Sequence, residues 1–284
     1  MEEQHTLRQK VEYTGRGLHT GQPARLRLLP ASPGEGITFY RMDLAGRPSI
    51  PARPEAVLST MRCTTLGWEE STTVRTVEHL LAALAGLGVD NVRVELWGPE
   101  IPAGDGSAQA FVDLLDQAGL QGQGVARRVR RLLQPVWASN GSAYIVALPA
   151  PVLKISFLFT NPNPAVGNLY AEYTPVPEVF RRELAPARTV AFLEELEALR
   201  RQGLANGGSE DMAVVVGPGG YVNARRFPDE IVRHKILDVM GDLALVGPLA
   251  AHIIALRSGH TLDVELARKI AAAGTGVDDS PAIG

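Results

Sequence analysis

The sequence contains a single cysteine, Cys63, among its 284 residues. One cysteine excludes an intramolecular disulfide and a metal cage built from several thiolates, and it fits a reducing compartment. No apolar run reaches the length that spans a bilayer, and the first residues, Met-Glu-Glu-Gln-His, are acidic where a signal peptide is basic and then apolar. We therefore expect a cytoplasmic protein with no stable membrane insertion.

A strong charge of either sign is also missing. The formal net charge is −3 at pH 7, which gives no global electrostatic reason to expect nucleic acid or an anionic membrane as a partner. The one basic run, Arg127, Arg128, Arg130 and Arg131, is interpreted as a solvated face. The hydrophobic share of 45% is ordinary for a soluble enzyme with a sizeable core. We expect no nucleic-acid partner.

Strands and helices alternate in an order that predicts an α+β fold. Residues 24–29 alternate apolar and charged side chains, as in a half-buried strand, and the β-branched residues 71–76 predict another strand. Thr76 then suits the cap of a helix through Glu78 and His79, and Ser107 suits the cap of a second helix. Further strands are predicted at residues 92–96, 132–137, 143–148, 153–159 and 250–256, and a terminal helix from about Thr261.

The glycine-rich residues 119–124 are interpreted as a linker near the middle of the chain. They divide it into an N-terminal α+β domain, residues 1–122, and a C-terminal α+β domain, residues 123–284. A faint repeat, Val77-x-His79-x-Leu81 and Val232-x-His234-x-Ile236, favours two related halves, although a chance match stays open. Related halves would bring the two histidines to the interface between domains, where ligand sites are common.

Residues 226–242 predict a helix with a metal-binding face. Pro228 suits the first turn of a helix, where its missing N–H would be unbonded anyway. His234, Asp238 and Asp242 recur every fourth residue and therefore share one face. A histidine and an aspartate one turn apart can both reach one metal ion. The alternative is a solvated helix face that carries an ordinary His–Asp pair.

A zinc site that leaves one position open for water needs a third protein ligand, and a hydrolase needs a carboxylate base beside it. Glu78 and His79 offer both residue types. His260 follows Ser258-Gly259, where a predicted strand ends and a helix begins, and such loops often present functional groups. A capping or surface role is the alternative for His260.

Several motifs occur in order between Gly15 and His260 and together match one family. They are Thr76–Asn91, Gly98–Pro102 with Asp105–Ala108, Ala187–Thr189, Gly203–Ala205 with Gly207–Ser209, Arg233–Asp238 with Gly241-Asp242, and Ser258–His260. The chain resembles the UDP-3-O-acyl-N-acetylglucosamine deacetylases, zinc amidases of lipid A biosynthesis. The resemblance implies two similar α+β domains, each a layered β-α-α-β sandwich, with the active site between them. It also implies a small β-α-β insert near residues 188–217.

The same resemblance implies a role for each residue of the metal face. His79, His234 and Asp238 resemble the zinc ligands, in agreement with the spacing argument, and Glu78 resembles the general base. Three further residues would complete the chemistry, and a fourth would add charge. His260, oriented by Asp242, would act in its protonated form on the oxyanion or the leaving amine, Thr189 would donate a hydrogen bond to the oxyanion, and Lys235 would add positive charge.

Substrate contacts are also expected from the resemblance, at Leu18, Met61, Cys63, Val190 and Gly208. The implied partner is a UDP-acyl-aminosugar, and a monomer is the default expectation. The chain departs from the family at residues 157–162, at Ala103-Gly104 and at Val190, which stands where the family has an aromatic residue. The prediction is therefore zinc-dependent removal of the acetyl group from UDP-3-O-(3-hydroxyacyl)-N-acetylglucosamine. The alternatives are an amidase of another N-acetylated sugar and a non-catalytic binding protein.

Overall fold

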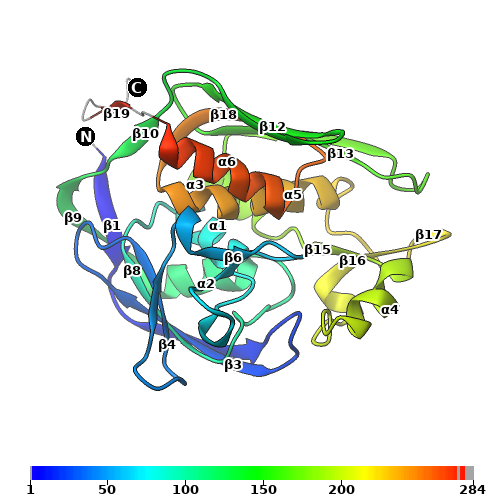
Figure 1. Cartoon of the computed structure of the whole chain (residues 1–284), viewed down its shortest axis with the longest axis horizontal. Coiled ribbons are helices and arrows are strands. Elements are labelled where there is room, and N and C mark those ends of the chain that lie inside the picture. The colour runs from blue at the N-terminus through cyan, green and yellow to red at the C-terminus, as the bar shows by residue number, and fades with distance from the viewer. Residues whose placement is uncertain (1, 274–275, 279–284) are drawn as a thin grey trace.

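The computed structural model describes residues 2–273 and 276–278, which form a mixed α+β protein (Figure 1). Residue 1 and residues 279–284, the outer ends of the two predicted domains, lie outside the described residues. Two sheets occupy opposite sides of the molecule, and the longer helices lie between them (Figure 1). Among the described residues, no helix combines the length and the apolar character needed to cross a bilayer.

The first sheet has five strands in the order β2-β3-β8-β4-β5. Its strands are β2 (Val11–Arg16), β3 (Pro23–Pro30), β4 (Ile37–Arg41), β5 (Ser49–Pro51) and β8 (Val92–Trp97). The predicted alternation is confirmed in β3, where Ala24, Leu26 and Leu28 are buried and the residues between them are not. This apolar face packs toward two helices, α1 (Glu78–Gly86) and α2 (Gln109–Ala118).

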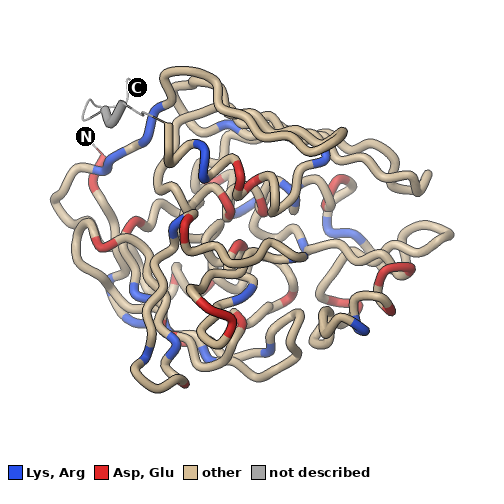
Figure 2. Tube along the Cα trace, viewed as in Figure 1, with Lys and Arg blue, Asp and Glu red and all other residues tan. Residues whose placement is uncertain are grey.

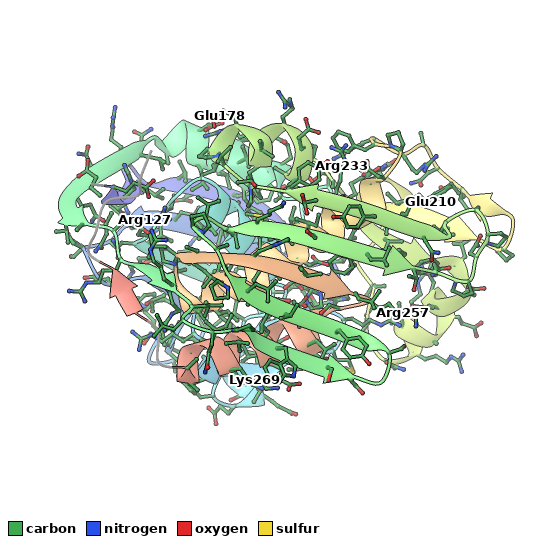
Figure 3. The ribbon with its side chains drawn as sticks, turned by 90° about the horizontal axis from the view of Figure 1, so that it is seen from above. Arg127, Glu178, Glu210, Arg233, Arg257 and Lys269 are labelled. Atoms are coloured by element: carbon green, nitrogen blue, oxygen red, sulfur yellow. The ribbon has the colours of Figure 1, made fainter. Side chains whose placement is uncertain are left out.

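The second sheet has seven strands, and it forms the outer layer in the view from above (Figure 3). Its strands are β10 (Val129–Arg131), β11 (Val136–Asn140), β12 (Ala143–Pro149), β13 (Lys154–Thr160), β14 (Asn168–Tyr173), β18 (Leu249–Leu256) and β19 (Gly276–Asp278). β18 runs antiparallel to β12 and parallel to β13. Two helices, α5 (Glu230–Leu243) and α6 (His260–Ala272), lie beneath this sheet and face the first half of the chain.

The layers therefore run sheet, helices, helices, sheet across the whole molecule. Each half supplies one sheet and one pair of helices, so the layering that was expected within each domain is completed only by both halves together. A sheet with one apolar face needs a single helix layer, and the two helix layers then bury their remaining apolar sides against each other. One hydrophobic core accordingly contains Leu80 and Leu84 of α1 together with Val239 and Leu243 of α5. Acidic and basic residues are interspersed over both halves (Figure 2).

Smaller elements connect these layers. They are β1 (Glu3–Leu7), β6 (Val57–Ser59), β7 (Thr65–Leu66), β9 (Leu120–Ala126), α3 (Pro177–Val179) with a π-helical turn (Phe180–Leu184), β15 (Thr189–Phe192), α4 (Leu193–Arg201), β16 (Ala213–Gly217) and β17 (Gly220–Tyr221). Short 3-10 turns cover Pro54–Ala56, Glu70–Thr72, Glu210–Met212 and Ala244–Val246. β15 and β16 run parallel, with α4 between them in sequence. Residues 189–217 thus form a β-α-β unit beside the main layers.

Three local predictions were wrong. Most of the expected linker, residues 119–124, lies in β9, which pairs with β1 from the other end of the first half. Residues 71–76 do not form a continuous strand, since Glu70–Thr72 is a 3-10 turn and Thr76 has a φ of 58°. Thr76 is not the helix cap either, because Val77 occupies that position and the Thr76 hydroxyl donates to Glu100. Long-range pairing and a buried carboxylate overrode the local propensities here.

Candidate metal centre and active site

Two imidazoles and one carboxylate converge between α1 and α5. His79 lies in the first turn of α1, and His234 and Asp238 lie one turn apart on α5. Nε2 of His234 lies 3.2 Å from Oδ1 of Asp238, and Nε2 of His79 lies 3.6 Å from the same oxygen. One candidate ligand atom from each residue lies within 4.8 Å of the others, and all three residues are buried. The cluster is thus assembled from both halves of the chain.

The carboxylate of Asp238 has one oxygen without a hydrogen-bond partner. Oδ1 is buried and has no hydrogen-bond partner among the residues that the structure describes, whereas Oδ2 accepts a hydrogen bond from Nζ of Lys235 at 2.7 Å. Nδ1 of His234 lies 2.9 Å from the carbonyl oxygen of Ala187, which leaves Nε2 to face the cluster. Buried polar atoms without partners are rare, and two imidazoles with one carboxylate are a donor set of zinc sites that keep an open position. His79, His234 and Asp238 therefore fit a zinc ion.

The surroundings of Asp238 keep the ligand carboxylate ionised. Burial alone would raise the pKa of Asp238, but His234 and Lys235 outweigh burial and hold the pKa of this carboxyl well below its usual range. Metal ligands bind in their deprotonated forms, so this environment prepares Asp238 for a cation. Lys235 therefore contacts Asp238 directly, since its ammonium group is bound to the ligand carboxylate.

Glu78 lies immediately before His79 and is almost fully buried. Its Oε2 accepts the N–H of Thr64 at 3.0 Å, and its Oε1 lies 4.0 Å from Nε2 of His260. Burial raises the pKa of Glu78 to about 7. A carboxylate with a pKa near the working pH is well matched to accepting a proton in catalysis. The geometry therefore supplies a base beside the metal ligands.

His260 is the first residue of α6, and it pairs with Asp242 of α5. Nδ1 of His260 lies 2.8 Å from Oδ2 of Asp242. Burial alone would lower the pKa of His260, but Asp242 outweighs burial and holds this pKa well above its ordinary value. His260 therefore carries a proton at neutral pH and can act as an acid.

Thr64 connects the acid and the base, and sequence reasoning did not single it out. Its N–H donates to Glu78, and its hydroxyl donates to Oδ1 of Asp242 at 2.5 Å. The two partners are 14 and 178 residues away in the sequence, so no spacing pattern could have revealed the link. The only signal was the position of Thr64 directly after Cys63, in a segment already expected near the site.

His19 was missed as well. It is buried, and burial is the largest cause that lowers its pKa, while the charges of Glu100, Glu78 and His260 also act on it. These interactions place His19 close to the acid and the base. The sequence signal was the glycine-rich turn of residues 15–21 that contains it.

Thr189 and Val190 begin β15, at the edge of the β-α-β unit. The N–H of Thr189 donates to the carbonyl of Gly106 at 2.9 Å. The preceding residue, Arg188, forms a buried ion pair with Glu230 at 2.9 Å, which ties β15 to the first residue of α5. Val190 is half-buried and packs on the small apolar cluster of this unit. Both residues thus lie beside the start of the helix that carries His234.

The remaining expected substrate contacts fall into two groups. Leu18 and Gly208 are neighbours, because the carbonyl of Leu18 accepts the N–H of Gly207 at 3.0 Å. Met61 is 55% exposed and available for a contact, but Cys63 is 0% exposed. The prediction that Cys63 touches the substrate therefore needs correction, since its thiol is enclosed by protein and lies 3.7 Å from the hydroxyl of Thr65.

Strained backbone lies just before several site residues. Arg62, Thr76 and Arg257 have positive φ values of 65°, 58° and 55°. They precede Thr64, Glu78 and His260 by two or three residues, and Arg257 lies at the end of β18 where the chain turns into α6 (Figure 3). Non-glycine residues in this region are costly and tend to persist at functional sites. Backbone strain thus occurs at three positions that lie just before Thr64, the base Glu78 and the acid His260.

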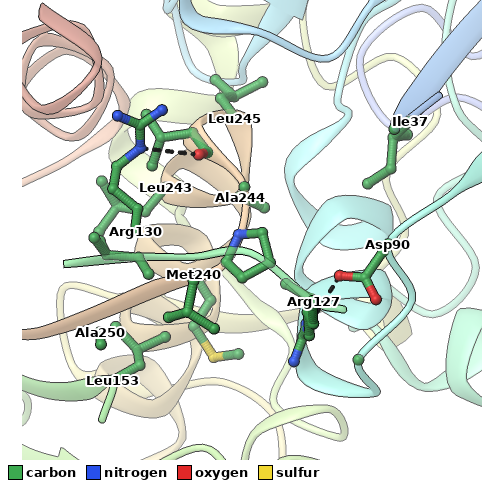
Figure 4. Close-up of a pocket in the computed structure, with 18 of the residues that line it drawn as sticks. Ile37, Asp90, Arg127, Arg130, Leu153, Met240, Leu243, Ala244, Leu245 and Ala250 are labelled. Carbon is green, nitrogen blue, oxygen red and sulfur yellow. Dashed lines mark hydrogen bonds and ion pairs between the residues drawn. The ribbon is translucent and has the colours of Figure 1, made fainter. Parts of the chain in front are cut away.

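A cavity of about 780 Å³ lies at the C-terminal ends of α1 and α5 (Figure 4). Its lining includes Met240 and Leu243, and none of the predicted site residues lines it. Arg127 on its wall is held by Asp90 at 2.8 Å, and Nε of Arg130 donates to the carbonyl of Val246. The Arg127–Asp90 pair ties the two halves together, the Arg130–Val246 contact lies within the C-terminal half, and the titratable cluster lies elsewhere. We therefore place the candidate active site at the metal cluster.

Comparisons with known proteins agree with one another. A family model described as LpxC, UDP-3-O-acyl N-acetylglycosamine deacetylase, matches residues 4–272. A protein of Nostoc sp. is 45% identical over 276 residues, which cover 95% of this chain and 98% of that protein. Proteins of Thermosynechococcus vestitus and Chlamydia muridarum are each 46% identical and cover 94% of both chains. All three relatives are named UDP-3-O-acyl-N-acetylglucosamine deacetylase.

Proposed function

Since the chain belongs to the UDP-3-O-acyl N-acetylglycosamine deacetylase family, we propose that it removes the acetyl group from UDP-3-O-(3-hydroxyacyl)-N-acetylglucosamine, a step of lipid A biosynthesis. The observation that carries this proposal is the convergence of His79, His234 and Asp238 directly beside Glu78. Oδ1 of Asp238 has no hydrogen-bond partner among the described residues. An enzyme that hydrolyses an amide with a metal ion needs these two parts together.

Zinc is the metal that this donor set favours, and His79, His234 and Asp238 would hold it. When bound, zinc supplies a Lewis acid that polarises an amide carbonyl and lowers the pKa of water. Lys235 holds the second oxygen of Asp238 at 2.7 Å and so fixes the orientation of this ligand. Its positive charge would also add to the field at the oxyanion.

Glu78 accepts the proton from the attacking water. Its pKa of about 7, raised by burial, makes it both available and basic enough near neutral pH. The N–H of Thr64 holds Oε2, which leaves Oε1 on the side of His260 for the transfer. Attack forms the C–O bond of a tetrahedral intermediate, and Thr189 would donate a hydrogen bond to its oxyanion.

His260 donates the proton that the leaving amine requires. Asp242 keeps Nδ1 occupied at 2.8 Å, so Nε2 is the nitrogen that faces the site and carries the transferable proton. The C–N bond then breaks, acetate leaves as one product, and the amine of the deacylated sugar leaves as the other. Because Asp242 raises the pKa of His260, the imidazole is protonated before the reaction starts.

The substrate contacts stay part of the proposal. Leu18, Met61, Val190 and Gly208 lie on loops and on the β-α-β unit of residues 189–217, which would hold the acyl chain. We also propose that residues 1–122 and 123–284 act as two similar domains with the site between them, supported by the origin of His79 and His234 in different halves. The monomeric state and the cytoplasmic location stay predictions.

The comparisons do not favour the two alternatives. A different N-acetylated sugar was suggested by residues 157–162 and Val190, but the relatives with this degree of identity carry a single substrate name. A non-catalytic binding protein would have no need for Glu78 beside the metal cluster, or for the pair of Asp242 with His260.

The test is deacetylation of UDP-3-O-acyl-N-acetylglucosamine by the purified, zinc-loaded protein, with Glu78→Ala and His260→Ala beside it. We expect turnover in the wild type and a loss of about 100-fold or more in kcat for each variant. A wild-type protein that binds one zinc ion without turning over this substrate would contradict the proposal and direct the search to other acetylated sugars.

A further inference from the structure

Glu100 is a fully buried carboxylate outside the acid–base machinery, and it accepts four hydrogen bonds. Oε1 accepts the N–H of His19 at 2.9 Å and the hydroxyl of Thr76 at 2.8 Å. Oε2 accepts the N–H and the hydroxyl of Thr20 at 2.7 and 2.6 Å. Each oxygen thus serves two donors, and together they join two segments that are more than fifty residues apart in the sequence.

The first of these segments contains Thr76 and leads into α1, the helix that carries the base Glu78. Thr76 has a positive φ of 58°, a costly conformation for a β-branched residue, and it lies two residues before Glu78. The N–H of Arg75 donates to the carbonyl of Pro99, and the N–H of Ile101 donates to the carbonyl of Arg75. Glu100 therefore lies between two backbone contacts to this segment and holds Thr76 by its side chain. Its bond to Thr76 helps to offset the strain that sets the start of α1.

The second segment, residues 17–21, contacts the β-α-β unit. The N–H of Asn206 donates to the carbonyl of His19 at 3.1 Å, and that of Gly207 donates to the carbonyl of Leu18 at 3.0 Å. These contacts connect the first half of the chain to the loop that follows α4. Leu18 and Gly208, two expected substrate contacts, lie within this junction.

The packing around Gly17 leaves no room for a side chain on either side. A Cβ on Gly17 would lie 2.1 Å from Oε2 of Glu100, and a Cβ on Gly207 would lie 2.0 Å from the carbonyl oxygen of Gly17. Real Cβ atoms do not approach so closely, so both glycines are required by contact. Glu100 therefore packs on Gly17, and Gly17 packs on Gly207. These contacts link the interior of the first half to the β-α-β unit.

We propose that Glu100 is a positioning residue that couples the start of α1, with Glu78 and His79, to the loop of residues 17–21 that seats the substrate-holding β-α-β unit. The proposal rests on the proposed function for the identity of the substrate but not for the coupling itself. Glu100 touches none of the reacting groups and acts through Thr76, Thr20 and the backbone of His19. Loss of the Glu100 carboxylate should weaken substrate binding more than it slows the chemical step.

Glu100→Gln tests this proposal, because the amide keeps the shape but replaces one acceptor oxygen by an NH₂ group that donates hydrogen bonds and accepts none. We expect the amide hydrogens of Asn206 and Gly207 to exchange about 10- to 100-fold faster than in the wild type. We also expect KM for UDP-3-O-acyl-N-acetylglucosamine to rise by a larger factor than kcat falls. Zinc binding provides the check that the metal site is intact.

Glu95→Gln is the matched control. Glu95 is also a buried carboxylate, five residues before Glu100 on β8, but it pairs with Arg27 and Arg93 instead of the two loops. This variant should leave the exchange of Asn206 and Gly207 and the value of KM unchanged. Equal changes in both glutamine variants would mean a general loss of packing and would overturn the coupling.

Thr20→Val keeps the test decisive if Glu100→Gln does not fold. It removes one hydroxyl of a half-buried residue, which donates to Glu100 and accepts the N–H of Gln22 at 3.3 Å, and it keeps the Thr20 N–H, so the same changes should appear at a smaller size. Exchange and KM at wild-type values in Glu100→Gln, or in Thr20→Val where the first variant is unfolded, overturn the proposal. Absence of wild-type turnover contradicts the proposed function alone, because amide exchange is measured without substrate and still decides the coupling.

Discussion

Gly241 of α5 lies directly against the backbone of Glu78 in α1. A Cβ on Gly241 would lie 2.0 Å from the carbonyl oxygen of Glu78 and 2.9 Å from its Cα. The absence of a side chain at this position thus sets the separation of the two helices. The same separation places Glu78 and His79 opposite His234 and Asp238, so the metal cluster depends on this contact.

Gly241→Ala should therefore weaken both the fold and the metal site. Alanine gains up to about 1 kcal/mol of helix propensity over glycine, but the clash with a backbone atom cannot be relieved by a side-chain rotation and costs about 1–3 kcal/mol or more. We expect a lower midpoint of thermal unfolding and weaker zinc binding by calorimetry. Gly219→Ala is the control, since a Cβ there meets nothing within 4 Å. Unchanged zinc affinity in Gly241→Ala would show that the helices separate without disturbing the ligands.

Zinc should stabilise the fold by mass action. At a free zinc concentration 100 times the dissociation constant, the free energy of unfolding should rise by about 2.7 kcal/mol. Magnesium at the same concentration should have a much smaller effect, because two of the three candidate ligands are imidazoles. Asp238→Asn should abolish most of the zinc effect, whereas Asp229→Asn, at the N-cap of the same helix and outside the metal cluster, should keep it. A chelator titration followed by denaturant unfolding measures all four cases, and equal stabilisation by both metals would contradict the assigned ligands.

The alkaline limb of the pH–rate profile should belong to His260. Asp242 holds the pKa of His260 well above its ordinary value, so activity should persist above pH 6.5 and decline only as pH passes this raised pKa. Asp242→Asn removes the negative partner, lowers the pKa of His260 and should move the decline in kcat/KM to lower pH. A limb that stays in place in Asp242→Asn would assign it to another group.

The same pair should make stability depend on pH. Because the pKa of His260 is higher in the folded protein than in the unfolded chain, its contribution is complete below about pH 6.5. The contribution is lost as pH rises through the folded pKa, since the folded state then releases its extra proton. Urea unfolding of the wild type and of His260→Gln at several pH values checks the sign. A difference between them that grows with increasing pH would contradict it.

Thr64→Val should slow catalysis through Asp242. Valine keeps the shape and the N–H that binds Glu78, but it leaves Oδ1 of Asp242 buried without the hydroxyl donor. Such a loss costs about 1–3 kcal/mol, so we expect kcat to fall by about 10-fold or more while Thr64→Ser stays near the wild type. Thr65→Val is the control, because the Thr65 hydroxyl contacts only the Cys63 thiol at 3.7 Å.

A double-mutant cycle separates this role from general packing. If Thr64 acts through Asp242, Thr64→Val should have little further effect on kcat in the Asp242→Asn background. Additive effects of the two substitutions would show that Thr64 acts independently of Asp242.

Relations within one helix could be predicted because their geometry is local. His234 and Asp238 are one turn apart, so a helix through residues 230–243 brings them together whatever surrounds it. The alternation at residues 24–29 likewise fixed which side chains of β3 face the core. Residue type and loop position made Glu78, His79 and His260 candidates, and the family motifs gave them roles, but no periodicity could supply their placement beside α5.

Contacts between distant segments were decided only by packing. Most of the expected linker, residues 119–124, forms a strand because its backbone pairs with β1. Thr76 took a positive φ because the buried Glu100 holds its hydroxyl, and Cys63 became enclosed although it lies near the site. Thr64 reaches Asp242 across 178 residues. The sequence by itself thus determined the candidate ligands and their helices, whereas the link between acid and base depends on how the two helix layers meet, which local propensity does not encode.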